Sequence, residues 1–161
     1  LKHYVYSVII QHEDMHTKNL SLIYDKDLVF FAPLYDVSCT GIYDTSKGYD
    51  SHLTINGKQS NIRPNDFKPL CKILKIDFKE FKEEAFKIAK LYETELPSYI
   101  EEIKALGSIS FYKKKQKARI GEGAYLKVSK IPIEFHELLS KFHKERVEHL
   151  KALGWIINES L

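Results

Sequence analysis

The chain has 161 residues, 43% of them hydrophobic, and its 25 Lys and Arg against 22 Asp and Glu leave a net charge of only +3. This size and apolar content fit a single domain over residues 1–161, and so small a charge does not by itself indicate a nucleic-acid or membrane partner. Cys39 and Cys71 are too few for a disulfide framework, and no apolar run approaches the ~20 residues that span a bilayer. We therefore expect a soluble, cytoplasmic protein.

The first third of the chain predicts a helix, a small hairpin and a long loop. Apolar residues at helical spacing predict a buried helix over Lys2 to Gln11, although its β-branched residues also allow a strand. Two β-rich runs, Leu20 to Tyr24 and Leu28 to Phe31, flank a polar turn and predict a short hairpin, which Pro33 ends. Residues 38–51 are rich in Ser, Thr, Gly and Asp, so we expect a loop of functional length.

Beyond this loop the pattern becomes mainly helical. Leu53 to Ile55 followed by Asn56-Gly57 predicts a short strand and a tight turn. Either Asn65 or Asp66 can cap a helix that runs through Ile76.

Three further helices are expected from their caps and apolar faces. They run from Asp77 through Tyr92, from Pro97 to Gly107, and from Pro132 to Leu153. The sequence therefore predicts a mainly α-helical fold with a small β-hairpin region.

The candidate site lies on the two loops that flank the predicted hairpin. Asp14 is followed five positions later by Asn19, which is the spacing of the kinase catalytic loop, where the Asp orients the hydroxyl nucleophile and the Asn binds Mg²⁺. Asp36 follows the hairpin, where a kinase has the metal-binding Asp of D-F-G. Mg²⁺ prefers carboxylate and amide oxygens. We therefore expect the three side chains to converge on a magnesium nucleotide.

A complete kinase also has a glycine-rich phosphate loop and a strand lysine before its catalytic loop. Only 13 residues precede Asp14, and the chain does not begin with Met. We expect a fragment or one half of a split enzyme, with the N-terminal ATP-gripping lobe encoded upstream and no activity from residues 1–161 alone.

Several motifs in order resemble the C-terminal part of the HipA-type serine/threonine kinases, which are toxins of bacterial toxin-antitoxin modules. The matching segments, which cover roughly residues 1 to 75, are Asp14-Met15-His16-Thr17-Lys18-Asn19, Ala32-Pro33-Leu34-Tyr35-Asp36-Val37-Ser38, Leu53-Thr54-Ile55-Asn56-Gly57-Lys58 and Asn65-Asp66-Phe67. The family often has Gly-Asn at the two positions that Gln11-His12 occupy here.

The resemblance implies a kinase C-terminal lobe that transfers the γ-phosphoryl group of ATP to a protein hydroxyl with Mg²⁺. Asp14 would be the general base, and Asn19 and Asp36 the Mg²⁺ ligands. Nucleotide contacts are implied for His16, Thr17, Lys18, Asn19, Tyr35 and Asp36. The implied partners are an N-terminal kinase lobe, a small DNA-binding antitoxin and a protein substrate. Members of the family act on aminoacyl-tRNA synthetases, so the resemblance also implies a toxin that arrests translation.

Taken singly, several of these residues have a plain structural interpretation. Asp14 could be a capping or surface residue, and Lys18 a solvated lysine. His16 could simply orient backbone, and Tyr35 could be a packing residue. The functional hypothesis depends on the joint pattern of Asp14 with Asn19 and Asp36.

Two other functions stay open. The run from His12 to His16 matches H-E-x-x-H, in which two histidines one helical turn apart bind zinc and Glu13 would be the base of a metalloprotease. That chemistry requires a helical segment and a third ligand. Alternatively, the chain is a non-catalytic helical module that binds an antitoxin or a partner subunit.

Basic residues concentrate in the run from Lys113 to Arg119. Such a run can bind nucleic acid or an acidic partner through counterion release, but only Phe111 and Tyr112 adjoin it as stacking groups. We expect a solvated basic loop and no direct nucleic-acid binding.

Overall fold

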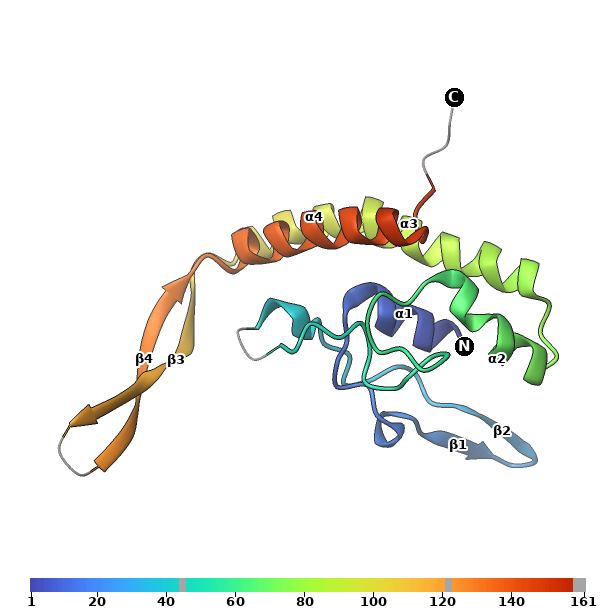
Figure 1. Cartoon of the computed structure of the whole chain (residues 1–161), viewed down its shortest axis with the longest axis horizontal. Helices are drawn as coiled ribbons and strands as arrows, with labels where there is room; N and C mark the ends of the chain where they lie inside the picture. Colours follow the sequence, from blue (N-terminus) through green and yellow to red (C-terminus); the bar gives the residue numbers. More distant parts are fainter. Residues whose placement is uncertain (44–45, 121–122, 158–161) are drawn as a thin grey trace.

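The computed structural model describes residues 1–43, 46–120 and 123–157. It is mainly helical, with two antiparallel hairpins (Figure 1). In chain order the elements are α1 (Lys2–Ile10), η1 (Thr17–Asn19), β1 (Leu22–Asp25), β2 (Leu28–Phe31), η2 (Thr40–Ile42), η3 (Pro64–Phe67), α2 (Lys68–Ile73), α3 (Phe78–Lys104), β3 (Ile109–Ile120), β4 (Gly123–Ile133) and α4 (Phe135–Leu153), where η marks a 3₁₀ helix. None of the described helices combines the length and apolar character needed to cross a bilayer.

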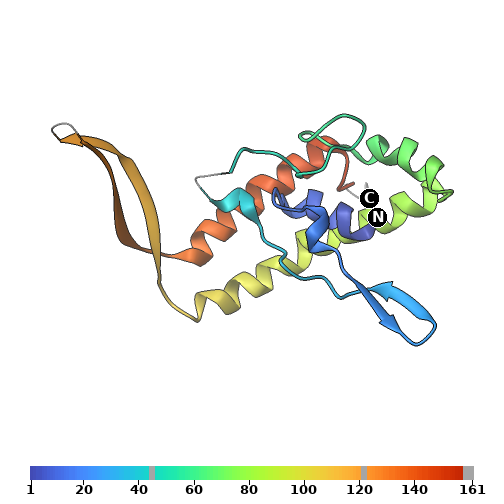
Figure 2. The same cartoon turned by 90° about the horizontal axis from the view of Figure 1, so that it is seen from below.

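The two long helices α3 and α4 lie side by side, and α1 packs against both of them (Figures 1 and 2). Val5, Val8 and Ile9 of α1 are at most 1% exposed, so this short helix is buried on several sides. That burial explains why apolar residues follow one another along α1 with little polar interruption. The helix predicted over Lys2 to Gln11 is thus confirmed.

An aromatic cluster joins the N-terminal helix to both halves of the chain. The Phe67 ring stacks on Phe81 at 5.1 Å and meets the edges of Tyr4 and Trp155 at 5.9 Å between ring centroids. The fully buried Trp155 indole donates a hydrogen bond to the Ile62 carbonyl at 2.7 Å. Edge and stacked contacts of this kind add to the free energy gained by burying the rings.

The predicted hairpin is formed by β1 and β2, with Leu22 opposite Phe31 and Asp25 opposite Leu28. Its residues are exposed along both strands. It lies on the side of α1 away from α3 and α4 (Figure 1). The mainly helical fold with this small hairpin is that of a kinase-like C-terminal lobe, as predicted.

The helix boundaries differ from the prediction where proline and the second hairpin intervene. The two helices predicted from Asp77 and from Pro97 form one helix, α3, and Pro97 lies inside it. A proline in a helix removes one backbone hydrogen bond, and the packing of α3 against α1 and α4 compensates for that loss. The Asp77 cap is confirmed, since its carboxylate accepts from the Glu80 amide at 2.9 Å. The final helix begins at Phe135 rather than Pro132, because Pro132 belongs to β4.

The second hairpin was not predicted. The basic run from Lys113 to Arg119 lies in β3, which pairs with β4, so the expected solvated loop is wrong. Consecutive lysines hide the alternation of apolar and polar residues by which a strand is usually recognised. Residues 53–55 likewise form only an isolated bridge, between Ile55 and Lys58, in place of the expected strand.

Candidate functional site

The candidate site begins where α1 ends. Gln11 adopts a left-handed conformation with φ 58°, which usually favours glycine, and this turns the chain sharply out of the helix. The His12 amide then donates to the Ser7 carbonyl at 2.9 Å. The following residues leave the helix and form the loop that carries Asp14.

Asn19 joins the two loops of the site. Its side-chain amide donates to the Asp36 carboxylate at 3.3 Å and to the Asp14 backbone carbonyl at 3.4 Å. Asn19 is 4% exposed, whereas Asp14 and Asp36 are exposed to solvent. The structure therefore brings together the three residues that the spacing singled out. The Asn19 side chain is buried, and Asp14 and Asp36 lie at the surface.

His12 is buried close enough to Asp14 and Asp36 for their carboxylates to affect its pKa. Burial lowers its pKa, the Asp14 and Asp36 carboxylates oppose that change, and His16 adds to it. The net lowering keeps the buried imidazole neutral at pH 7. His12 is therefore a buried, neutral side chain. Because both carboxylates affect its pKa, Asp14 and Asp36 both lie near it.

The remaining predicted nucleotide contacts lie around this centre. Thr17 and Lys18 are exposed on η1, and His16 is half-buried just before it. The Tyr35 hydroxyl donates to the Lys18 carbonyl at 2.8 Å and lies 2.7 Å from the Ser21 hydroxyl. Tyr35 thus fastens the Asp36 loop to the loop that bears Asn19.

Glu13 has a structural function that sequence reasoning did not assign. Its carboxylate accepts hydrogen bonds from the Ser46 hydroxyl and from the amides of Lys47 at 2.9 Å, Gly48 at 2.8 Å and Tyr49 at 3.1 Å. Burial alone would raise its pKa, but these donors stabilise the anion and the pKa is lowered overall. Glu13 therefore anchors residues 46–49 beside the candidate site.

This arrangement does not match a zinc protease. The helix α1 ends at Ile10, so His12 and His16 do not lie one turn apart on a helix, and Glu13 is engaged by the 46–49 loop. Within the described residues no group of three His, Cys, Asp or Glu side chains is placed to hold a metal ion. The zinc-binding geometry is thus not formed at this segment.

Arg146 and Asp50 form a buried ion pair that sequence reasoning missed. The Arg146 guanidinium donates to Asp50 at 2.8 Å, to the Ile9 carbonyl at 3.0 Å and to the Val8 carbonyl, and both charged side chains are almost fully buried. The other Asp50 oxygen accepts from the Ile62 amide at 2.9 Å. The pair connects α4 to the C-terminus of α1, directly before the candidate site. A charged residue on the apolar face of the last helix was the only sequence signal for it.

A largely apolar pocket of about 590 Å³ opens beside Asn19. It lies between the start of α1, the base of the β1–β2 hairpin and residues 53–55. Its lining includes Tyr4, Met15, Asn19, Phe31, Leu34 and Ile55. A pocket of this size and character suits a small organic ligand with an apolar ring.

The oxygen atoms at this centre are of the kind that Mg²⁺ binds. Asn19 and Asp36 offer one amide and one carboxylate, and Mg²⁺ is commonly held by one or two protein ligands together with water and substrate phosphates. The donor set therefore fits a magnesium nucleotide better than a metal held by protein alone.

In this helical lobe a small hairpin lies between the loop that carries Asp14 and Asn19 and the loop that carries Asp36. This arrangement defines the class as a kinase-like C-terminal lobe. The family model of the HipA-like C-terminal domain matches residues 1–108, and the chain belongs to this family. No curated protein matches the chain. The β3–β4 hairpin and α4 lie outside the matched residues.

Proposed function

We propose that this chain supplies the catalytic and magnesium-binding half of a serine/threonine protein kinase of the HipA type. The observation that carries the proposal is the pair of hydrogen bonds from Asn19 to Asp36 and to the Asp14 backbone. These bonds join Asn19 to the Asp36 carboxylate, 17 positions away, and to the backbone of Asp14, and they support a shared site for a candidate base and two oxygen ligands.

In this proposal each residue has one role. Asp14, exposed at the surface, aligns the substrate hydroxyl and receives its proton. Asn19 and Asp36 hold Mg²⁺, which when bound neutralises charge on the nucleotide phosphates. Lys18, exposed on η1, is placed to contact phosphate.

The apolar pocket beside Asn19 is the proposed site of the adenine ring. Its lining by Phe31, Leu34 and Met15 offers apolar surface to a planar base, while Asn19 marks the end at which the phosphates would lie. This assignment explains why a mainly apolar pocket and a polar loop share Asn19.

We further propose that an N-terminal kinase lobe covers the β1–β2 hairpin. Large apolar side chains on one face of this hairpin are exposed, including Tyr24 at 74%, Val29 at 56% and Phe31 at 69%. A contiguous exposed apolar surface of this kind typically marks a protein interface. ATP would then lie between the two lobes, so this chain alone would not transfer phosphate.

The decisive experiment measures phosphoryl transfer from ATP to a protein hydroxyl by the kinase with its N-terminal lobe present. Asp14→Asn should lower the rate on the order of 10²-fold or more while nucleotide binding is retained. Asp36→Asn and Asn19→Ala should lower both the rate and Mg²⁺-dependent nucleotide binding. The control is Glu83→Gln on the exposed surface of α3, which also removes one carboxylate charge and should change neither quantity.

Full activity of the Asp14→Asn variant would show that the assigned role is wrong. If the two-lobe protein bound no magnesium nucleotide at all, the alternative would hold, and the chain would be a non-catalytic helical module that binds a partner.

A further inference from the structure

A second pocket lies where α1, α3 and α4 meet. Its volume is about 320 Å³, which is at the lower end of the range for small-molecule sites. Each of the three helices contributes two residues that are four positions apart and therefore share a face. These pairs are Tyr6 with Ile10, Tyr92 with Leu96, and Phe135 with Leu139. Among the described residues, none lines both this pocket and the one beside Asn19, so the two are separate sites.

The segment that follows Asp36 forms a further wall of this pocket. Val37, Ser38 and Cys39 all line it. A ligand in the pocket would therefore contact the chain directly after the proposed magnesium ligand. The α4 residues of the lining lie outside the residues that the family model matches, so the matched region alone does not form the pocket.

The lining of the pocket is mainly apolar and carries no charge. None of the described residues that line it is Asp, Glu, Lys, Arg or His. Burial raises the pKa of the Cys39 thiol to about 11 and also raises the pKa values of Tyr6 and Tyr92, so these groups stay neutral at pH 7. An ion moved from water into such a pocket would lose its hydration without an opposite charge to replace it. The pocket therefore favours a neutral ligand.

Tyr92 brings an unsatisfied polar atom to this site. Its side chain is only 8% exposed, and its hydroxyl has no hydrogen-bond partner among the described residues. The Cys39 thiol and the Tyr6 hydroxyl both affect its pKa, so the Tyr92 hydroxyl lies near two other groups that line the pocket. A buried hydroxyl without a partner is unfavourable. An acceptor atom on a ligand would satisfy it.

We propose that this pocket binds a small neutral molecule that has an apolar ring and one hydrogen-bond acceptor, such as an aromatic ketone. The ring would pack against Ile10, Leu96 and Leu139, and the acceptor would receive a hydrogen bond from the Tyr92 hydroxyl. None of these four residues belongs to the proposed phosphoryl-transfer site. Binding at this pocket is therefore measured independently of kinase activity.

The test compares two probes of similar shape by fluorine NMR titration with the 161-residue chain. The first, para-fluoroacetophenone, has a carbonyl acceptor, and the second, para-fluoroethylbenzene, lacks it. The test variant is Tyr92→Phe, which removes only the hydroxyl. The matched control is Tyr99→Phe on the same helix, at a tyrosine that is 56% exposed. Urea denaturation of both variants shows whether they fold, and Tyr92→Phe should not lower stability because its hydroxyl has no partner to lose.

Tyr92→Phe should weaken binding of the ketone by about 3- to 10-fold, as expected for one hydrogen bond, and should change binding of the ethylbenzene probe by less than about 2-fold. Tyr99→Phe should change neither affinity. Bound ketone should also slow the alkylation of Cys39 by N-ethylmaleimide in proportion to its occupancy, because the thiol lines the pocket.

Three binding results would overturn the proposal. They are no binding of the ketone to the wild type, an equal loss of both probes in Tyr92→Phe, and ketone binding that leaves the alkylation of Cys39 unchanged. A marked loss of stability in Tyr92→Phe would also overturn it, because the hydroxyl would then already have a partner in the protein.

Discussion

At the scale of single residues, the candidate site depends on side chains that hold its loops together. Asn19, Tyr35 and Glu13 each connect a loop of the site to a distant segment through hydrogen bonds. Loops positioned by a rigid scaffold commonly carry function, and here the α1 helix and these side chains form the scaffold. Small changes in these side chains should therefore loosen the site before they unfold the protein.

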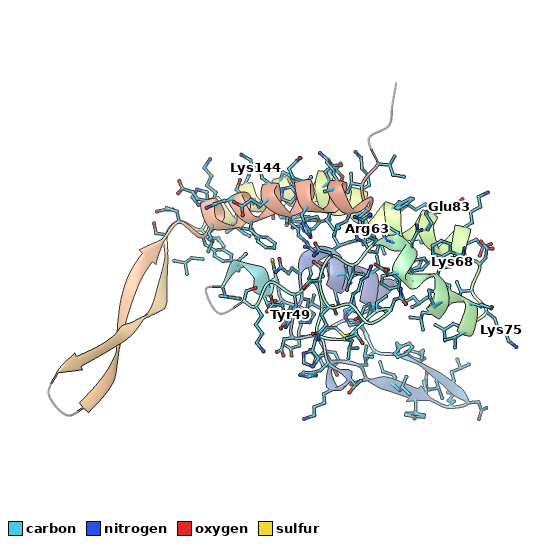
Figure 3. All side chains as sticks on the ribbon, viewed as in Figure 1. Tyr49, Arg63, Lys68, Lys75, Glu83 and Lys144 are labelled. Atoms are coloured by element: carbon cyan, nitrogen blue, oxygen red, sulfur yellow. The ribbon has the colours of Figure 1, made fainter. Side chains whose placement is uncertain are left out.

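Glu13→Gln should lower the free energy of unfolding by about 1–3 kcal/mol, because several donors of the 46–49 loop lose a charged acceptor. Urea denaturation at pH 7 measures the change. The matched control is Glu83→Gln on the outer surface of α3, which should have no effect (Figure 3).

The same contact predicts a pH dependence. The pKa of Glu13 is lowered from its ordinary value of 4.5, with burial opposing the change and the Ser46 hydroxyl and loop amides producing it. A lowered pKa contributes stability that is present above pH 4.5 and is lost as the pH falls through the pKa of the folded state. The difference between the wild type and Glu13→Gln should therefore be constant above pH 5 and shrink below 4.5. A difference that grew on acidification would contradict the assignment.

Tyr35→Phe removes only the hydroxyl that joins the Asp36 loop to Lys18 and Ser21. The free energy of unfolding should fall by about 1 kcal/mol, as for a typical hydrogen bond. Tyr24→Phe, on an exposed tyrosine of β1, is the control and should leave stability unchanged. If the two variants were equally stable, the Tyr35 hydroxyl would not hold the loops together.

At the scale of elements, α4 stabilises the end of α1 through one side chain. Arg146 satisfies the carbonyls of Val8 and Ile9, which lie at the C-terminus of α1, and neutralises Asp50. Orphan carbonyls at a helix end must be satisfied when they are buried. The ion pair thus sets the direction in which the chain leaves α1 toward Asp14.

Arg146→Ala should destabilise the fold by about 3–5 kcal/mol, because it leaves the Asp50 carboxylate buried without its cationic partner. Arg146→Lys keeps the charge but cannot reproduce the fork of donors, so an intermediate loss is expected. Chemical denaturation measures both. The control is Lys144→Ala on the outward face of α4, which should change stability by less than about 0.5 kcal/mol (Figure 3).

At the scale of the whole molecule, the two hairpins project from opposite parts of the helical body (Figure 2). The β1–β2 hairpin is short and apolar, whereas the β3–β4 hairpin is long and basic. The exposed apolar side chains of the first hairpin are why we assign an N-terminal kinase lobe to it as a partner.

Phe31→Ser should weaken association with a separately produced N-terminal kinase lobe at least 10-fold, because a large exposed aromatic at an interface commonly contributes more than 1 kcal/mol. Isothermal titration calorimetry measures the affinity. Leu91→Ser, on an apolar residue of α3 that is 57% exposed, is the control. Equal affinities for the wild type and Phe31→Ser would place the lobe on another surface.

Local patterns in the sequence were sufficient for much of this protein. Helical spacing predicted α1, a polar turn between two β-rich runs predicted β1–β2, and Asp77 predicted the start of α3, because each signal lies within a few neighbouring residues. Motif spacing also singled out Asp14, Asn19 and Asp36, and the ordered motifs identified the HipA-like family.

Tertiary structure decided what depends on contacts between distant residues. The ion pair of Arg146 with Asp50 spans 96 positions and the Glu13 anchor spans 33 to 36, so no local pattern could reveal either. The pairing of β3 with β4 likewise contains an irregularity between Lys114 and Lys117, which the run of lysines does not disclose. Spacing along the chain selects residue types, whereas burial and strand register determine which of them meet.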